Sequence, residues 1–332
     1  MRLYFRMAVI YTAVALMIEA AREGSAAEMV AVSFGATLTT TGMTTLGLIL
    51  PVVLVLAAII GKAATLERGG QLLYAVFGVI ILQLGFTFMK SSIPDMMPFY
   101  ADPALAAIDR SLLFGRDAWQ LAHDIGPAID ANRLLPAYVY VWSLCVLVMP
   151  AVVALTDRDE ERVFRFVILR FVVWVGLGNV LAVMFASVGP VFYDSLTGSS
   201  RFAGLTAALQ ASGVADSAVG RLQRYLWSAY VSHDKQLGSG ISAFPSVHLG
   251  IATATAVYMA ERSRWLILPG AAFVAVMFYL SLYTGYHYAI NGYVSIVLIL
   301  AVWAGLRLWQ RARRAGGSRD IDADGGLPQS GR

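Results

Sequence analysis

Charged residues are scarce in this chain, and that scarcity excludes most soluble folds. Asp, Glu, Lys and Arg make up 14% of the 332 residues, and hydrophobic residues make up 58%. A soluble domain has about 25% charged residues. The mean hydropathy of +0.67 agrees with a chain made for a membrane. We therefore predict an integral membrane protein.

Cysteine and histidine are also rare. The one cysteine, Cys145, lies in an apolar block and can form no intramolecular disulfide, so we expect an inert core residue. The four histidines and this cysteine form no cluster of the kind that binds zinc. No glycine loop follows a strand and opens a helix, as nucleotide-binding motifs require. We expect neither a metal nor a cofactor.

Apolar residues gather in eight segments, most of which approach the ~20 residues that a helix needs to cross a bilayer. The sixth is short and needs a tilted or thin crossing. The first could be a cleaved signal peptide, but Glu19 and its length favour a retained span. This pattern predicts an all-α integral membrane protein, a polytopic helical bundle of about eight spans. The expected spans are 3–21, 43–64, 72–89, 135–155, 164–188, 244–259, 265–282 and 288–309.

Basic residues lie in alternate turns and in the tail. With eight spans they all fall on one side, which by the positive-inside rule makes both termini cytoplasmic in an inner, or cell, membrane. The tail, 311–332, therefore determines topology, and we expect no nucleic-acid partner. From Gly316 onward its composition predicts disorder. The basic residues are Arg2 and Arg6 before the first span, and then Lys62, Arg68, Arg158, Arg162, Arg262, Arg264, Arg311, Arg313, Arg314 and Arg319.

Two long external segments complete the organisation. Residues 90–134 show apolar spacing of three and four, which predicts short amphipathic helices on the membrane surface. Residues 189–243 are polar but contain six aromatics, which predicts a folded cap. Residues 22–42 could form a short external helix. The resulting divisions are N-terminal spans over 1–90, a membrane domain over 91–310 that carries the cap, and the tail.

Two histidines lie where spans begin. His248 follows Gly238-Ser239-Gly240-Ile241-Ser242-Ala243-Phe244-Pro245-Ser246-Val247. Glycines let backbone N–H groups turn toward an anion, and Pro245 suits the first turn of a helix. Ser246 and the free amides at that helix start could hold a phosphate, with Ser239 and Gly240 in the preceding turn.

His287 lies in Tyr283-Thr284-Gly285-Tyr286-His287-Tyr288-Ala289-Ile290-Asn291. Between His248 and His287 the chain crosses the membrane and returns, so both imidazoles lie at the outer boundary. Such a pair suits phosphoryl transfer, because one imidazole can attack phosphorus while the other protonates the leaving oxygen.

These motifs resemble a known superfamily. Phe244-Pro245-Ser246-Val247-His248 is similar to the central motif of the type-2 phosphatidic acid phosphatases, and Tyr286-His287-Tyr288-Ala289-Ile290-Asn291 to their last motif. Residues 189–194, 201–203 and 108–119 resemble the branch of inositol phosphorylceramide synthase. The resemblance covers about 95–305. It implies a six-helix core and metal-independent chemistry, with His287 as the nucleophile and His248 as general acid and then base.

The sequence departs from that superfamily at two points. Asn291 stands where Asp usually follows the nucleophilic histidine. We expect its carbonyl to accept the Nδ1–H bond of His287, or Asp194 or Asp234 to supply the carboxylate. The arginine usual just upstream of His287 is absent, since Leu280 and Ser281 occupy that stretch. We therefore expect Arg201 to bind phosphate, with Lys235, Arg221 or Arg224 as alternatives.

These features predict a lipid phosphoryl or headgroup transferase, or a lipid phosphate phosphatase, with its site at the outer face. The substrate would be a membrane lipid with a phosphate headgroup, and the acceptor a lipid alcohol or water. The branch resemblance favours transfer slightly. The alternative is a catalytically inactive lipid-binding or transport protein of the same fold, for which Asn291 is the argument.

Overall fold

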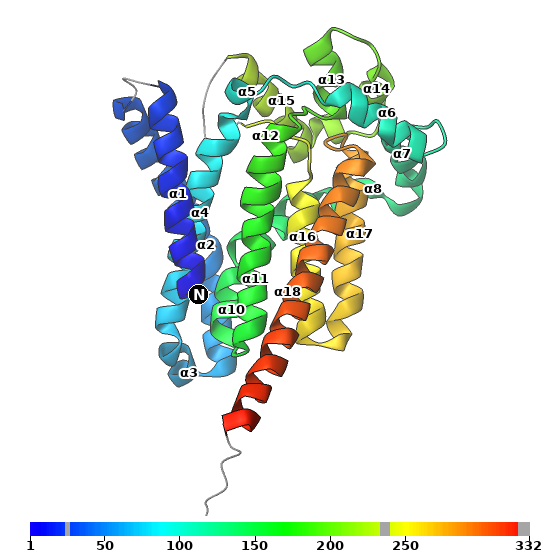
Figure 1. The fold of residues 1–332 in the computed structure, drawn as a ribbon. Helices are drawn as coiled ribbons and strands as arrows, with labels where there is room; N and C mark the ends of the chain where they lie inside the picture. The colour runs from blue at the N-terminus through cyan, green and yellow to red at the C-terminus, as the bar shows by residue number, and fades with distance from the viewer. Residues whose placement is uncertain (24–26, 233–239, 325–332) are drawn as a thin grey trace, which may run out of the picture.

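The protein is a bundle of long helices with a layer of short helices over one end (Figure 1). The computed structural model describes residues 1–23, 27–232 and 240–324, and these residues form helices and no strand. In Figure 1 the short helices lie at the top, and α3 and the far end of α18 lie at the bottom. The expected all-α polytopic bundle is confirmed.

Seven of the eight expected spans match helices in this bundle. Within the described residues, six helices are long and apolar enough to cross a membrane. A bent pair, 131–147 and 149–156, meets at 42° and brings the number to seven. The expected sixth span is α16 (Val247–Arg262), which has 16 residues and is shorter than the ~20 that a full crossing needs. It lies against α17 and α18, and residues 240–246 before it are not helical.

The N-terminal helices are α1 (Arg2–Glu23), α2 (Ala27–Ile60), α3 (Lys62–Glu67) and α4 (Gly69–Ser91). Most of residues 22–42 belong to α1 and α2, so the expected separate external helix is wrong. Helix α1 packs closely along α4, because Gly78 and Gly85 leave room for Tyr4 and Thr12. A Cβ atom at Gly78 would lie 2.7 Å from the Tyr4 ring.

The segment after α4 forms the short helices that its periodicity predicted. They are α5 (Ile93–Met96), α6 (Asp102–Leu112), α7 (Ala118–Ile129) and α8 (Ala131–Pro136). The chain then turns down through the π-helix η1 (Ala137–Val141), α9 (Trp142–Leu147) and α10 (Met149–Thr156).

The bend between α9 and α10 is supported by a buried arginine. Pro150, at the start of α10, cannot donate the next helical hydrogen bond, so carbonyls of the preceding turn lose their partners. Arg170 fills this need: its guanidinium donates to the carbonyls of Cys145 at 2.9 Å and Val146 at 2.5 Å. The broken span is therefore a stable feature of the bundle.

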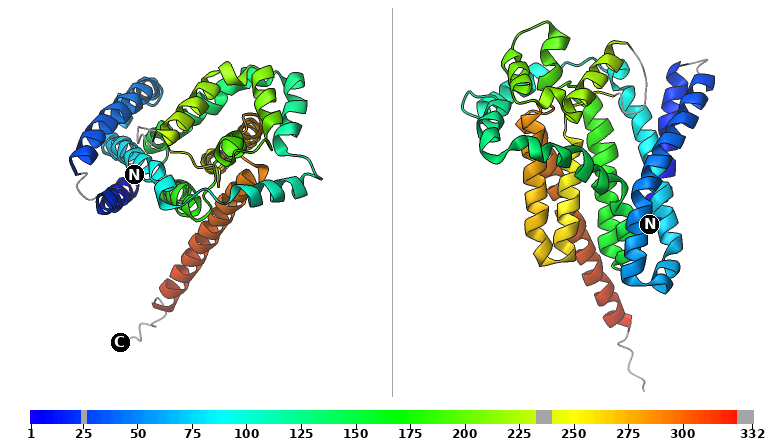
Figure 2. Two further views of the ribbon diagram at one scale, coloured as in Figure 1. Left: turned by 90° about the horizontal axis from the view of Figure 1, so that it is seen from above. Right: turned by 180° about the vertical axis from the view of Figure 1, so that it is seen from behind.

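The chain returns through α11 (Glu160–Phe171), the π-helix η2 (Val172–Leu181) and α12 (Ala182–Met184) to the cap. The cap is folded, as expected, from α13 (Pro190–Thr197), α14 (Ala203–Ala211), η3 (Val214–Asp216) and α15 (Ala218–Val231). Figure 2 shows these helices grouped over one end of the bundle, away from the far end of α18.

The last helices are α16, η4 (Arg264–Leu266), α17 (Ile267–Tyr283) and α18 (Ala289–Asp324). Helix α18 continues past Gly316, so the expected loss of regular structure there is wrong as far as Asp324. At the end of the bundle opposite the cap, Glu261 joins three helices. It accepts hydrogen bonds from Arg165 at 2.9 Å and from the Trp303 indole at 2.7 Å. This contact fixes α16 lengthwise between α11 and α18.

Candidate active site

Both predicted histidines line one cavity at the cap end of the bundle. The cavity has a volume of 340 Å³. The centroids of the His248 and His287 rings lie 6.1 Å apart. Gly240 also lines the cavity, so three of the predicted site residues come together. The walls come from the ends of α4, η1 and α9, from the segment before α16 and from the cap. They include Tyr138, Trp142, Ser143, Phe192, Leu226, Ile241 and Tyr286.

His287 is held as a neutral imidazole with one defined tautomer. It lies in the short link between α17 and α18, and its Nδ1 is 2.7 Å from the carbonyl oxygen of Ala243. A carbonyl can only accept, so Nδ1 carries the proton and Nε2 keeps its lone pair. Burial, together with the charge of Lys90, lowers the pKa of His287 to about 4. At neutral pH this residue therefore presents an unprotonated Nε2.

His248, in the first turn of α16, is clamped between two aromatic rings. Its centroid lies 4.5 Å from that of Tyr138, with the rings 2° from parallel, and 4.3 Å from that of Trp142. Trp142 is in turn packed edge-on against Trp174. The broken fourth span supplies both rings of the clamp. Its π-helical and bent geometry therefore decides how His248 faces His287.

Ser246, which the sequence predicted as a phosphate-binding residue, makes a structural contact. It is fully buried at the N-cap of α16, where its Oγ accepts a hydrogen bond from the Leu249 amide at 3.3 Å. This is the usual function of a serine at a helix start. It does not line the cavity. Gly240 is needed for space, because a Cβ there would approach the Lys90 carbonyl oxygen to 2.5 Å.

Lys90, at the end of α4, is the cation that lines the cavity, and the sequence analysis did not single it out. Its ammonium group also lies 5.8 Å from the centre of the Phe86 ring. A lysine at the end of an apolar span usually extends its charge to the interface, so this one carried no signal of a site. The signal that could have found it is its position at the same membrane boundary as the histidines.

The predicted phosphate-binding arginine points elsewhere. The guanidinium of Arg201 pairs with Asp117 at 2.8 Å and lies over the Phe202 ring, and Arg201 does not line the cavity. The alternatives Arg221 and Arg224 donate to the carbonyls of Asp216 and Ala215. Lys235 and Ser239, like His233 and Asp234, lie outside the described residues.

Asn291 lies at the site, but it faces the opposite way to our expectation. Its Nδ2 donates to the Ala243 carbonyl at 2.9 Å, the same oxygen that the imidazole of His287 contacts. The expected bond from His287 to the Asn291 carbonyl is therefore wrong. Among the described residues, the buried Oδ1 of Asn291 has no hydrogen-bond partner. Asp194, the expected substitute carboxylate, accepts from Ser199 and the Phe202 amide within the cap.

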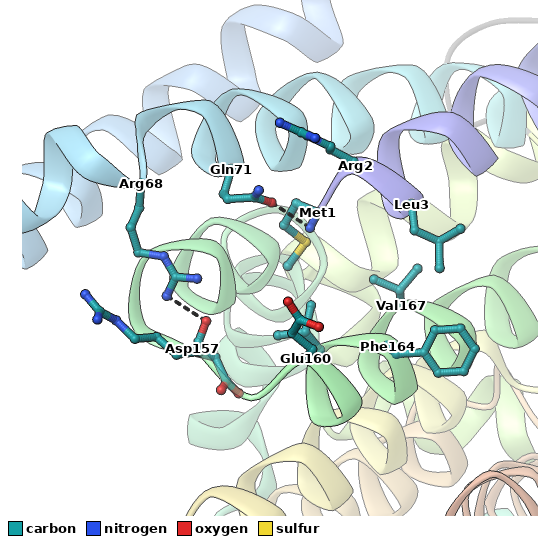
Figure 3. Close-up of a pocket in the computed structure, with 11 residues that line it drawn as sticks. Met1, Arg2, Leu3, Arg68, Gln71, Asp157, Glu160, Phe164 and Val167 are labelled. Carbon is teal, nitrogen blue, oxygen red and sulfur yellow. Dashed lines mark hydrogen bonds between the residues drawn. The ribbon is translucent and has the colours of Figure 1, made fainter. Parts of the chain in front are cut away.

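His123 has a structural environment outside this cavity. Its Nε2 lies 2.9 Å from the Tyr283 carbonyl, and its ring stacks on that of Tyr283. A second cavity, of 390 Å³, lies among α1, α4 and α11 (Figure 3). Arg68 and Asp157 line it, and the Arg68 guanidinium donates to the Asp157 carbonyl at 2.6 Å. None of the residues lining it is a histidine, so we regard the first cavity as the candidate active site.

Comparison with known proteins gives one match. The sequence model described as the PAP2 superfamily matches residues 103–305. The match takes in both histidines, Asn291 and the cap, and leaves out Lys90 with the helices α1 to α4. No curated protein matches the chain. No solved structure matches it either.

Proposed function

We propose that this chain, which belongs to the PAP2 superfamily, transfers or hydrolyses the phosphoryl group of a membrane lipid through a covalent phosphohistidine at His287. Members of the superfamily generally catalyse phosphoester hydrolysis or transfer. The observation that carries the proposal is the pair of imidazoles, 6.1 Å apart in one cavity, one of which is fixed with a free Nε2.

The mechanism follows from the tautomer of His287. Its Nε2 attacks phosphorus, the bond from phosphorus to the leaving oxygen breaks, and His248 donates a proton to that oxygen. In the second step His248 takes a proton from water or an alcohol, whose oxygen attacks phosphorus and displaces Nε2. The Ala243 carbonyl accepts the Nδ1–H bond throughout and stabilises the positive charge on the phosphorylated imidazole. Lys90 would bind the phosphate oxygens.

The charge of the cavity favours a phosphodiester as substrate. Among the described residues that line it, Lys90 is the one cation. A phosphodiester carries one negative charge, whereas a phosphomonoester carries nearly two at neutral pH. A buried charge that has no partner is costly, so one cation suits one negative charge. A lipid diester as donor supports headgroup transfer, which the resemblance to inositol phosphorylceramide synthases also favours.

The basic residues in the turns between the long helices support a site at the outer face. The short turns at the end opposite the cap hold Lys62, Arg68, Arg158 and Arg162. By the positive-inside rule this end faces the cytoplasm, and the histidines then face the periplasm or exterior of an inner membrane. Reporter fusions at Gly198 and after Ala315 test the orientation. We expect opposite sides, with Ala315 inside.

The decisive test is turnover of a labelled phospholipid panel by purified protein in lipid nanodiscs with a metal chelator. We expect wild type to release or exchange the headgroup, and His287→Ala and His248→Ala to be at background. The matched control is His123→Gln, which alters a half-buried histidine outside the cavity and should keep near-wild-type turnover. Wild type that is given lipid with a radioactive phosphate and quenched in alkaline detergent should carry the label on the protein, and acid should release it.

The inactive alternative gives a different result in the same assay. Wild type and His287→Ala would then show equal background rates on lipids that an active member of the superfamily turns over. That result would end the enzymatic proposal.

A further inference from the structure

A buried carboxylate lies one layer behind the histidines. Asp102, in the first turn of α6, is 1% exposed. Its oxygens accept hydrogen bonds from the Ser187 hydroxyl at 2.7 Å, the Val188 amide at 2.8 Å and the Gly189 amide at 2.9 Å. The Tyr288 hydroxyl adds a fourth donor at 3.1 Å. These four donors replace the water that the enclosed carboxylate has lost.

Hydrogen bonds connect this carboxylate to the backbone of Ala243, the residue that His287 contacts. The Val188 N–H, which donates to Asp102, shares a peptide group with the Ser187 carbonyl. That carbonyl accepts from the Ala243 amide at 2.8 Å. The Ala243 carbonyl in turn accepts from Nδ1 of His287 at 2.7 Å. The N–H and the carbonyl of Ala243 belong to different peptide groups on either side of its Cα, so Asp102 acts on His287 by holding the backbone of Ala243 in place.

The carboxylate also fixes the other side of the imidazole. Tyr288 follows His287 directly in the chain, and its hydroxyl ends on Asp102. Gly189 allows this close packing: its φ is +83°, and a Cβ there would lie 2.9 Å from Cβ of Ala243. Asp102 therefore holds both the residue that His287 contacts and the residue next to it.

We propose that Asp102 is a positioning residue for His287, because it fixes the 187–189 backbone and, through the Ser187 carbonyl, the backbone of Ala243. Asn291 also donates to the Ala243 carbonyl, so both side chains help to hold the atom that orients the imidazole. The catalytic meaning of this support depends on the proposed function. The positioning itself is a property of the fold.

The matched control is Asp109, on the same helix. Asp109 is 2% exposed and accepts from the Ile290 amide at 3.0 Å, so it also binds the start of α18. Its hydrogen bonds do not lead to Ala243. Asp102→Asn and Asp109→Asn each exchange a buried carboxylate for an amide of the same shape. Ser187→Ala removes one donor to Asp102 but keeps the Ser187 carbonyl, to which the Ala243 amide donates.

The test is the nuclear magnetic resonance signal of the His287 Nδ1–H proton in protein that contains isotope-labelled histidine, assigned by its loss in His287→Ala. We expect Asp102→Asn to move this signal upfield, since the hydrogen bond to Ala243 weakens, and Asp109→Asn and Ser187→Ala to leave it near its wild-type position. In the turnover assay Asp102→Asn should lower kcat about tenfold to hundredfold with little change in KM, by analogy with the loss of a partner that orients a metal-ligating histidine. Asp109→Asn should retain kcat.

The two measurements separate this proposal from the proposed function. A signal that moves equally in Asp102→Asn and Asp109→Asn, or in neither, overturns the positioning role even in an active enzyme. A signal that moves only in Asp102→Asn, in a protein without turnover, supports the positioning role and overturns the proposed function. If Asp102→Asn does not fold, Tyr288→Phe removes one donor without touching the charge. Tyr288→Phe should leave the signal near its wild-type position. A clear upfield shift would refute the 187–189 backbone as the main connection between Asp102 and His287.

Discussion

Replacing Asn291 by aspartate, which restores the residue usual in the superfamily, should damage this protein. The amide Nδ2 faces the Ala243 carbonyl oxygen at 2.9 Å, and a carboxylate oxygen in the same place would face another acceptor. From the motif alone, Asn291→Asp would be expected to preserve or raise activity. The structure predicts the opposite, because the partner atom can accept a hydrogen bond and cannot donate one.

The magnitude can be worked out from the surroundings of the side chain. Asn291 is 0% exposed, and its Oδ1 has no partner among the described residues. Asn291→Ala loses one hydrogen bond, worth about 1 kcal/mol. Asn291→Asp loses the same bond and adds an uncompensated buried charge, which costs about 3–5 kcal/mol. The aspartate variant should therefore be the less stable of the two at neutral pH by several kcal/mol.

Thermal unfolding of wild type, Asn291→Ala and Asn291→Asp in detergent, followed by intrinsic fluorescence across a pH series, measures this. Lowering the pH protonates the new carboxyl, which can then donate to Ala243, so the gap between the aspartate variant and wild type should shrink. The reasoning fails if Asn291→Asp is as stable as wild type at neutral pH and turns over lipid faster. The amide would then be an acceptor, as the sequence suggested.

Three further predictions concern charged groups. Lys90→Gln should lower kcat/KM about tenfold to hundredfold, as for a lost charge-assisted hydrogen bond. It should also raise the pH below which activity falls, because the Lys90 charge helps to lower the pKa of His287. The control Lys62→Gln, on exposed α3, should change neither kcat/KM nor this pH. Arg201→Gln should cost about 1 kcal/mol of stability, as for a partly exposed ion pair, and leave kcat/KM for lipid unchanged; a large rise in KM would place Arg201 at the phosphate after all. Burial raises the pKa of Asp109, so its ionised form is penalised in the folded state. Asp109→Asn should therefore unfold at a higher temperature than wild type at neutral pH, and the difference should fade as the pH falls. A lower unfolding temperature of this variant at every pH would refute the reasoning.

The architecture followed from the sequence because it depends on local properties. Whether a segment crosses a membrane is decided by its own length and hydrophobicity, so seven of the eight expected spans match helices. The meeting of His248 and His287 also followed, because one descending and one ascending helix between them must return the chain to the same boundary. The aromatic content of 189–243 predicted its folding for a similar reason, since buried rings need a packed environment.

The contacts of the site were decided by tertiary structure. Lys90 reaches the cavity from a position 158 residues before His248, and no local pattern marks it. Asn291 is a donor because the nearest atom is the carbonyl of Ala243, which a motif cannot specify. Ser246 ends as a helix cap, Arg201 pairs with Asp117, and Asp102 accepts hydrogen bonds from the 187–189 backbone. The direction of a hydrogen bond and the partner of a charge depend on which distant atoms packing brings within about 3 Å, whereas hydrophobic periodicity is a property that each segment carries alone.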